Sequence, residues 1–416
     1  MFITQTLFEL KKISKPLVAA LFVLLVVTLA IPVGHELTQP TYGRSYNPEN
    51  SILLSTTAKN SGKEELKQDL MTRMRVDRTF ALHRLKIGAI KSGLLPSELK
   101  KERRIVNFYN KALPLLATNK FQKVNQLSSE LLTSHPNPAN YELAIWLLGS
   151  AMTSHVPSDK LFRTQQSAIL KYAPTKIAAI SVYSDALNLI LPTIIGWGEY
   201  DTHSKPLAVT MVIWIIGIVL CASVFSNKRK TFTDSLARLT PLGDSRLYVS
   251  RALAALIVFE GIILLAYAAI ILVTAMTPGH NLGVFNFPII IFTNGDFASN
   301  PLILILAKAL IYYTLWFIQL SGLTVILHQL TRNQITIVFW LVIVSFAQQL
   351  GILALFPASV AAYIPAYFIN LPQLILHFAP FGSVGMVNFT AVTVFWTGAA
   401  TIIAAVIKAL QQKRAF

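Results

Sequence analysis

Six long apolar stretches run along the chain, and each is long enough to cross a lipid bilayer as a helix. The first, residues 16–34, holds no charged side chain, and at about 1.5 Å per residue it would cover most of a ~30 Å hydrocarbon core. Only 13% of the 416 residues are charged and 54% are hydrophobic, which leaves too few polar side chains to cover a soluble fold. We therefore predict an all-α integral membrane protein with six transmembrane helices. The other five stretches are residues 206–224, 252–276, 301–328, 335–356 and 391–410.

The distribution of Lys and Arg predicts which segments face the cytoplasm. The short segment 277–300 has Asp296 as its only charge, and 357–390 has no charged residue. The connections 225–251 and 329–334 and both ends of the chain are basic. The positive-inside rule therefore places both termini in the cytoplasm. The formal net charge of +17 then reflects topology and anionic lipid rather than a nucleic-acid partner, which would need a basic face on a soluble fold. The basic residues of the predicted cytoplasmic segments are Lys11, Lys12, Lys15, Lys228, Arg229, Lys230, Arg238, Arg246, Arg251, Arg332, Lys413 and Arg414.

Residues 1–15 alternate apolar and charged side chains in a pattern typical of a helix that lies along the membrane interface. A cleaved signal peptide is the competing interpretation. The apolar run that follows is longer than a signal-peptide core, and no small-residue cleavage site is clear, so we expect residues 16–34 to remain as the first span.

Residues 35–205 are polar and long enough to form a domain, which we predict to be helical and extracellular. Helix-period patterns cover residues 63–92 and 98–116. Lys and Arg crowd this half of the domain. They are either an ordinary solvated helix face or a contact surface for an anionic outer surface or substrate. A long external loop with positive charge does not conflict with the positive-inside rule, which governs short loops.

Residues 177–198 are apolar but are interrupted by Asp185, Asn188 and Pro192, with Trp197 and Tyr200 near the end. We predict a helix that returns to the outer interface, where such aromatic residues are enriched, rather than a seventh span.

Residues 357–390 are too apolar for a free loop and too rich in proline for another span. They are predicted to form a re-entrant external hairpin, since irregular backbone is tolerated at membrane depth where protein covers it. Phe356, Phe378 and Phe381 are candidates for an apolar external gate.

Residues 225–251 form a basic insert between the second and third spans. Read as a helix, Phe232, Leu236 and Leu239 share one side at i, i+4 and i+7, and Pro241 then interrupts the pattern. The insert is either an ordinary Lys- and Arg-rich cytoplasmic loop or a docking surface for a cytoplasmic partner.

This arrangement resembles the membrane subunit of an ATP-binding cassette (ABC) exporter of the type-2 permease family. The resemblance rests on the start FELKK, a large insertion after the first span, and the insert FSNKRKTFTDSLARLTPLGDSRLYVSRAL followed by four further spans. The family joins these spans by a charged cluster, a Thr, a Leu, and a Pro followed by a polar residue and Arg. Asn227, Lys228, Arg229 and Lys230 stand here where the family usually has an acidic cluster with a Gly.

The resemblance implies that the insert is a coupling helix that docks on a separate ATPase subunit. It also implies a homodimer or a heterodimer with a second permease, in a bacterial plasma membrane. No GxxxxGK[ST] phosphate loop occurs, so the chain itself is expected to bind no cofactor, and ATP and magnesium belong to the partner. The residues that match the coupling segment are Phe232, Leu236, Arg238, Leu239, Pro241 and Arg246.

Glu260 and Lys308 are ionisable residues deep inside predicted spans, where a charge is costly unless it is paired or hydrated. Glu260 lies about 13 Å into the third span and Lys308 about 10 Å into the fourth. They could pair with each other, Glu260 could line a substrate path or a dimer interface, or Glu260 could pack as the protonated acid. The single cysteine, Cys221, lies in an apolar run and is predicted to be a packing residue.

Two functions remain from these observations. The first is an exporter subunit, driven by a separate ATPase, for an amphipathic peptide, drug or lipid-like cargo. The second is a sensory or mechanotransmission protein that acts through its extracellular domain with little transport. A secondary transporter is disfavoured because the two halves show no internal repeat.

Overall fold

The computed structural model describes residues 2–38, 63–91, 96–120, 123–124, 127, 185–196, 208–226, 244–278, 280–293, 296–331, 333–377, 381 and 384–413. These residues are predominantly helical, with one two-stranded antiparallel sheet. The chain divides into two compact units. The first comprises Met1–Ile31, Thr193–Ile270 and Ile305–Phe416, and the second comprises Pro32–Pro192 and Ile271–Leu304.

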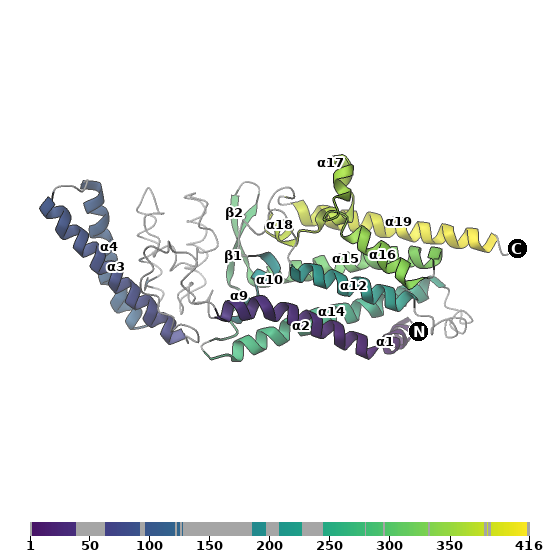
Figure 1. Cartoon of the computed structure of the whole chain (residues 1–416), viewed down its shortest axis with the longest axis horizontal. Coiled ribbons are helices and arrows are strands. Elements are labelled where there is room, and N and C mark those ends of the chain that lie inside the picture. The colour runs from purple at the N-terminus through teal and green to yellow at the C-terminus, as the bar shows by residue number, and fades with distance from the viewer. Residues whose placement is uncertain are drawn as a thin grey trace. The chain divides into compact units, whose positions relative to one another are not determined.

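Five described helices are long and apolar enough to cross a membrane, which indicates a multi-pass membrane protein. In the first unit they run roughly parallel as a bundle (Figure 1). Their composition explains the arrangement, because helices that are apolar on every side are stable only when buried or in lipid. These helices are α2 (Lys15–Thr38), α12 (Ala208–Ser226), α14 (Asp244–Met276), α15 (Leu302–Thr331) and α19 (Gly385–Lys413).

Helix α12 is the most buried of the five. Trp214 on α12 stacks on Trp316 of α15, with ring centroids 4.6 Å apart. A Cβ added at Gly217 would lie 3.3 Å from side-chain atoms of both Leu320 and Trp316, so this glycine permits the close approach of α12 to α15. Cys221 is fully buried and lies 3.6 Å from the Ser321 hydroxyl, as its place in an apolar run predicts.

The fifth apolar stretch does not form one continuous helix over residues 335–356, and that prediction is wrong. Helix α16 (Gln334–Ser345) has 12 residues and spans only about 18 Å. Gly351 adopts a left-handed conformation with φ 73°, which no α-helix tolerates, and it begins η6 (Ile352–Leu355). The short helices α17 (Ala358–Ala361), η7 (Pro365–Phe368) and α18 (Leu371–Ile375) follow.

In the second unit, α3 (Lys63–Lys91) and α4 (Pro96–Ala117) pack as an antiparallel hairpin, which confirms the two helices predicted there. Buried Met71, Met74, Ala112 and Leu116 lie on the packed faces. The helix α1 (Phe2–Lys12), in the first unit, is the predicted amphipathic start of the chain.

The second unit also contains strands β1 (Pro288–Thr293) and β2 (Asp296–Pro301), which pair from Pro288 opposite Pro301 to Thr293 opposite Asp296. This sheet is a local correction to the all-α prediction. The residues of β1, PIIIFT, are rich in isoleucine, which favours strands, but six residues were too few to distinguish from an apolar loop.

Residues 185–196 also differ from the prediction of one helix at the outer interface. They form two short helices, α9 (Ala186–Leu189) and α10 (Pro192–Ile195), whose residues are buried. The amide of Ala186 donates to the carbonyl of Asn281 at 2.8 Å. Gly283 has φ +89°, and a Cβ there would lie 2.7 Å from the Cβ of Asp185, so only glycine fits against this buried segment. Trp197 and Tyr200 lie outside the described residues.

Candidate functional site: the anchors of the basic insert

The centre of the basic insert, residues 227–243, lies outside the described residues. Phe232, Leu236, Arg238, Leu239 and Pro241 therefore stay sequence predictions. The described residues on either side show how the two ends of the insert are held.

The two ends of the insert lie next to each other. Phe225, in the last turn of α12, stacks on Tyr248, in the second turn of α14, with ring centroids 6.4 Å apart. An aromatic pair of this kind stabilises by about 0.5–1.5 kcal/mol beyond its burial. The helix ends that flank the insert are therefore in direct contact with each other.

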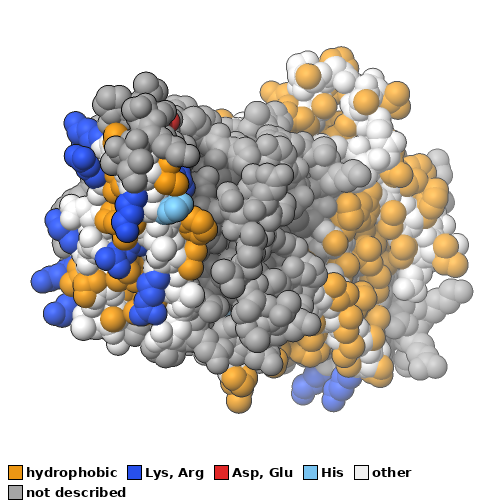
Figure 2. All heavy atoms as spheres, turned by 60° about the vertical axis from the view of Figure 1, so that its left-hand side comes forward, with side chains coloured by type: hydrophobic (Ala, Val, Ile, Leu, Met, Phe, Trp, Pro, Cys, Tyr) orange, Lys and Arg blue, Asp and Glu red, His pale blue; other side chains and the backbone are white. Residues whose placement is uncertain are grey.

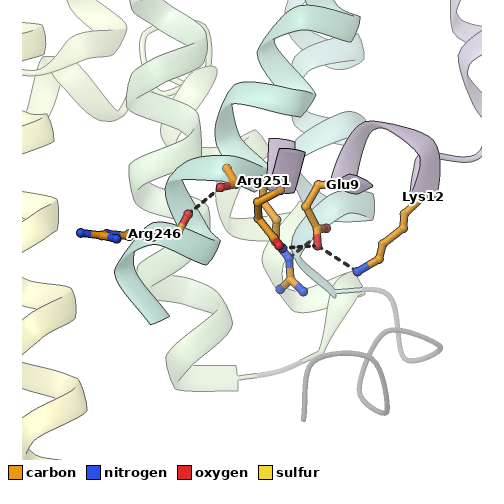
Figure 3. Close-up of polar contacts among 6 residues, drawn as sticks. Glu9, Lys12, Arg246 and Arg251 are labelled. Atoms are coloured by element: carbon orange, nitrogen blue, oxygen red, sulfur yellow. Dashed lines mark hydrogen bonds and ion pairs between the residues drawn. The ribbon is translucent and has the colours of Figure 1, made fainter. Parts of the chain in front are cut away.

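A buried ion pair joins the first turns of α14 to the N-terminal helix α1 (Figure 3). The Arg251 Nε donates to the Glu9 Oε2 at 3.3 Å, and the two side chains are 2% and 1% exposed. The Lys12 Nζ donates to the other oxygen, Oε1, at 2.9 Å. Burial of a carboxylate is costly unless it is paired, and here two cations from different helices meet one carboxylate.

The orientation of α1 follows from this pair. Glu9 and Thr6 are buried, whereas Phe2, Ile3, Leu7 and Phe8 are exposed. A helix that turns its carboxylate toward the protein and its apolar side outward suits the membrane interface.

Arg246 lies on the same helix as Arg251 but differs from it in burial. Its side chain is exposed and points away from Glu9 (Figure 3). Its carbonyl accepts a hydrogen bond from the Ser250 hydroxyl at 2.8 Å. Of the residues assigned to the coupling segment, Arg246 is the one that the structure describes, and its exposure leaves it accessible to a partner.

Glu260 and Lys308 do not form the ion pair that was one of the alternatives raised by their positions in the sequence. The Glu260 Oε1 instead accepts a hydrogen bond from the Thr314 hydroxyl of α15 at 2.7 Å. Thr314 lies six residues beyond Lys308, which places the lysine nearly two turns away along α15. Among the described residues Lys308 has no ion-pair partner, and it is half-buried, as expected of a side chain whose stem lies along apolar surface.

We expect charge reversal at both Glu260 and Lys308 to fail to rescue either single reversal. Replacing Thr314 with valine should lower stability by about 1–3 kcal/mol, because it removes a hydrogen bond from a carboxyl group inside a span. Thr314→Ser keeps the hydroxyl and is the matched control. Thermal unfolding of the purified protein in detergent measures all of these variants, and a double reversal that restores wild-type stability would contradict the Thr314 contact.

The structure describes two of the three gate candidates, and they differ in burial. Phe378 lies outside the described residues, Phe356 is exposed, and Phe381 is buried. The Phe381 ring contacts Tyr367 and Phe368, each at a centroid distance of 5.4 Å. Phe381 is therefore part of an aromatic core rather than a free surface.

That aromatic core attaches the segment after α16 to two long helices. The Phe368 ring lies 5.3 Å from that of Phe389 on α19. The Tyr312 hydroxyl of α15 donates to the carbonyl of Phe368 at 3.0 Å. Tyr312 is ten residues, or about 15 Å, into α15, so the short helices turn back into the bundle and do not extend from it as a free loop.

The Glu9–Arg251 pair was not predicted from the sequence. One signal was present, because Glu9 is the only acidic residue among the first 35. Its partner is 242 residues away, and no local pattern specifies a contact of that separation.

No protein-family model, characterised protein or solved structure matches the chain.

Proposed function

We propose that the chain is the membrane subunit of an exporter whose energy comes from ATP hydrolysis on a separate subunit. The observation that carries the proposal is the buried link from Arg251 to Glu9 at the start of α14. Helix α14 starts at the end of the basic insert and continues for 33 residues into the apolar bundle. The ion pair would hold this start in place, so that a movement of the insert would be passed along α14.

The proposed mechanism is a rigid-body movement. An ATPase docked on the insert would move the joined ends of α12 and α14 together, because Phe225 and Tyr248 pack against each other. The Glu9–Arg251 pair would make α1 move with them, so that the bundle would respond as one body. Cargo would enter between two copies of the subunit, and an amphipathic peptide, drug or lipid-like molecule suits the apolar surroundings.

The proposal includes six crossings of a bacterial plasma membrane with both termini in the cytoplasm. Helix α16 is too short to cross alone, so we infer that the fifth crossing combines it with the short helices that follow. The contact of Tyr312 with the Phe368 carbonyl supports this inference, because it holds these helices beside the middle of the bundle.

The direct test is copurification. Purification of the tagged chain from its native membranes should yield an ATPase with a phosphate-binding loop in a fixed ratio to the chain, identified by mass spectrometry. A preparation that holds no such ATPase after mild cross-linking in the membrane would contradict the proposal.

A further inference from the structure

The α3–α4 hairpin carries a concentrated positive charge that the proposed function does not use. Residues 71–115 contain eleven Lys or Arg and three Asp or Glu, a net charge of +8. The other end of the hairpin, residues 63–70 and 116–123, contains four Lys and three Asp or Glu and is close to neutral. The charge therefore lies toward the connection between the two helices.

Two of the three carboxylates of this region make contacts inside the hairpin. Glu102 is buried and accepts a hydrogen bond from Arg84 at 3.1 Å, and Asp77 accepts one from the Tyr109 hydroxyl at 3.4 Å. Most of the described cations, in contrast, are turned outward, as Figure 2 shows. The exposed ones among residues 71–115 are Arg75, Arg84, Lys86, Lys100, Arg103 and Lys111.

These two contacts also fix the register of the hairpin. Residue 84 lies level with 102, and 77 lies level with 109. By the same register Lys86 lies level with Lys100, and Arg75 lies level with Lys111. Like charges at the same level of two packed helices repel each other, and an anion bound across both helices would relieve that repulsion.

Exposed apolar side chains lie among the cations. Phe80 is 60% exposed and Ile87 is 42% exposed. Together with Arg84, whose side chain is 62% exposed, they occupy i, i+4 and i+7 of α3 and so share one side of the helix. A soluble polyanion gains little from an exposed phenylalanine, whereas a lipid surface accepts the ring at its interface and binds the cations through its phosphates.

We propose that the α3–α4 hairpin binds the headgroup surface of an anionic phospholipid bilayer. Lys86 and Lys100 contact lipid phosphates from the two helices, and Phe80 enters the boundary between headgroups and acyl chains. The proposal does not depend on the exporter function, since it uses only this hairpin and its charges.

The test uses the full chain in nanodiscs of neutral phosphatidylcholine, with binding to added vesicles measured by flotation. Vesicles that contain phosphatidylglycerol should bind, and vesicles of phosphatidylcholine alone should not. The double variant Lys86→Gln with Lys100→Gln should weaken binding roughly 30-fold at low ionic strength, since each cation near an anionic surface contributes about 5-fold. Phe80→Ser should also weaken binding. The matched control, Lys63→Gln with Lys67→Gln, removes the same charge from the neutral end and should bind like the wild type.

Three results would overturn the proposal. These are equal binding to both kinds of vesicle, unchanged binding of the Lys86 and Lys100 double variant, or binding of inorganic polyphosphate without binding of anionic vesicles. Melting temperatures measured on the same preparations show whether each variant is folded. Because Lys86 and Lys100 are exposed, their replacement should leave the melting temperature unchanged.

Discussion

Replacement of Arg251 by leucine is expected to lower the free energy of unfolding by about 3–5 kcal/mol. The reason is that the buried Glu9 carboxylate keeps only one of its two cationic partners. The Glu9 carboxylate, which is 1% exposed, loses the guanidinium that lies 3.3 Å from its Oε2. Lys12 remains near Oε1 but reaches the carboxylate from the same helix and compensates only in part. Thermal or denaturant unfolding of the purified protein in detergent measures the loss.

Two further variants separate the ion pair from the general effect of losing an arginine. Arg246→Leu removes an exposed arginine from the same helix and should change stability by less than about 0.5 kcal/mol. The double variant Glu9→Leu with Arg251→Leu should recover most of the stability lost in Arg251→Leu, because the deeply buried carboxylate is removed with its partner and only the partly exposed Lys12 loses a contact. Equal small losses in Arg251→Leu and Arg246→Leu would show that the pair does not hold α1 to α14.

Replacement of both Leu236 and Leu239 by aspartate is expected to weaken binding of the ATPase about 100-fold or more. The two leucines share the apolar side of the predicted coupling helix, and truncation of two buried anchors at an interface removes several kcal/mol of binding free energy. Added carboxylates would also have to be desolvated against the partner. The measurement is the amount of ATPase retained on the immobilised chain at increasing ATPase concentration.

The control for this prediction is Ala237→Asp, which adds a carboxylate on the other side of the same predicted helix. It should retain binding within about 2-fold, because that side faces away from the partner. Gel filtration of each variant shows whether the bundle is intact. If both kinds of variant bind alike, the insert is an ordinary basic loop.

The sequence was sufficient for those parts of the fold that depend on local hydrophobicity. Five helices long and apolar enough to span a membrane lie where apolar stretches predict them, and the α3–α4 hairpin follows its helix-period pattern. Hydropathy could not predict that α16 ends at Ser345, because residues 346–356 are apolar whether they are helical or not. The left-handed Gly351 was the local sign of that ending.

The candidate site could be predicted only in part, because its contacts join distant segments. The position of the insert followed from its charges, but the contacts of Glu9 with Arg251 and of Phe225 with Tyr248 depend on how the helices pack. The contact of Glu260 likewise could not be predicted from the sequence. Its depth in the span was clear from the sequence, but the choice of Thr314 over Lys308 depends on the rotation of α15 relative to α14.

The most direct measurement of the proposed coupling is the rate of ATP hydrolysis by the copurified ATPase in proteoliposomes, with and without this chain. We expect a rate several-fold higher with the chain present, and a return to the rate of the ATPase alone when Leu236 and Leu239 are aspartate. An ATPase whose rate is the same with the wild-type chain, with the variant chain and without any chain would contradict a function in which this subunit is driven by ATP hydrolysis.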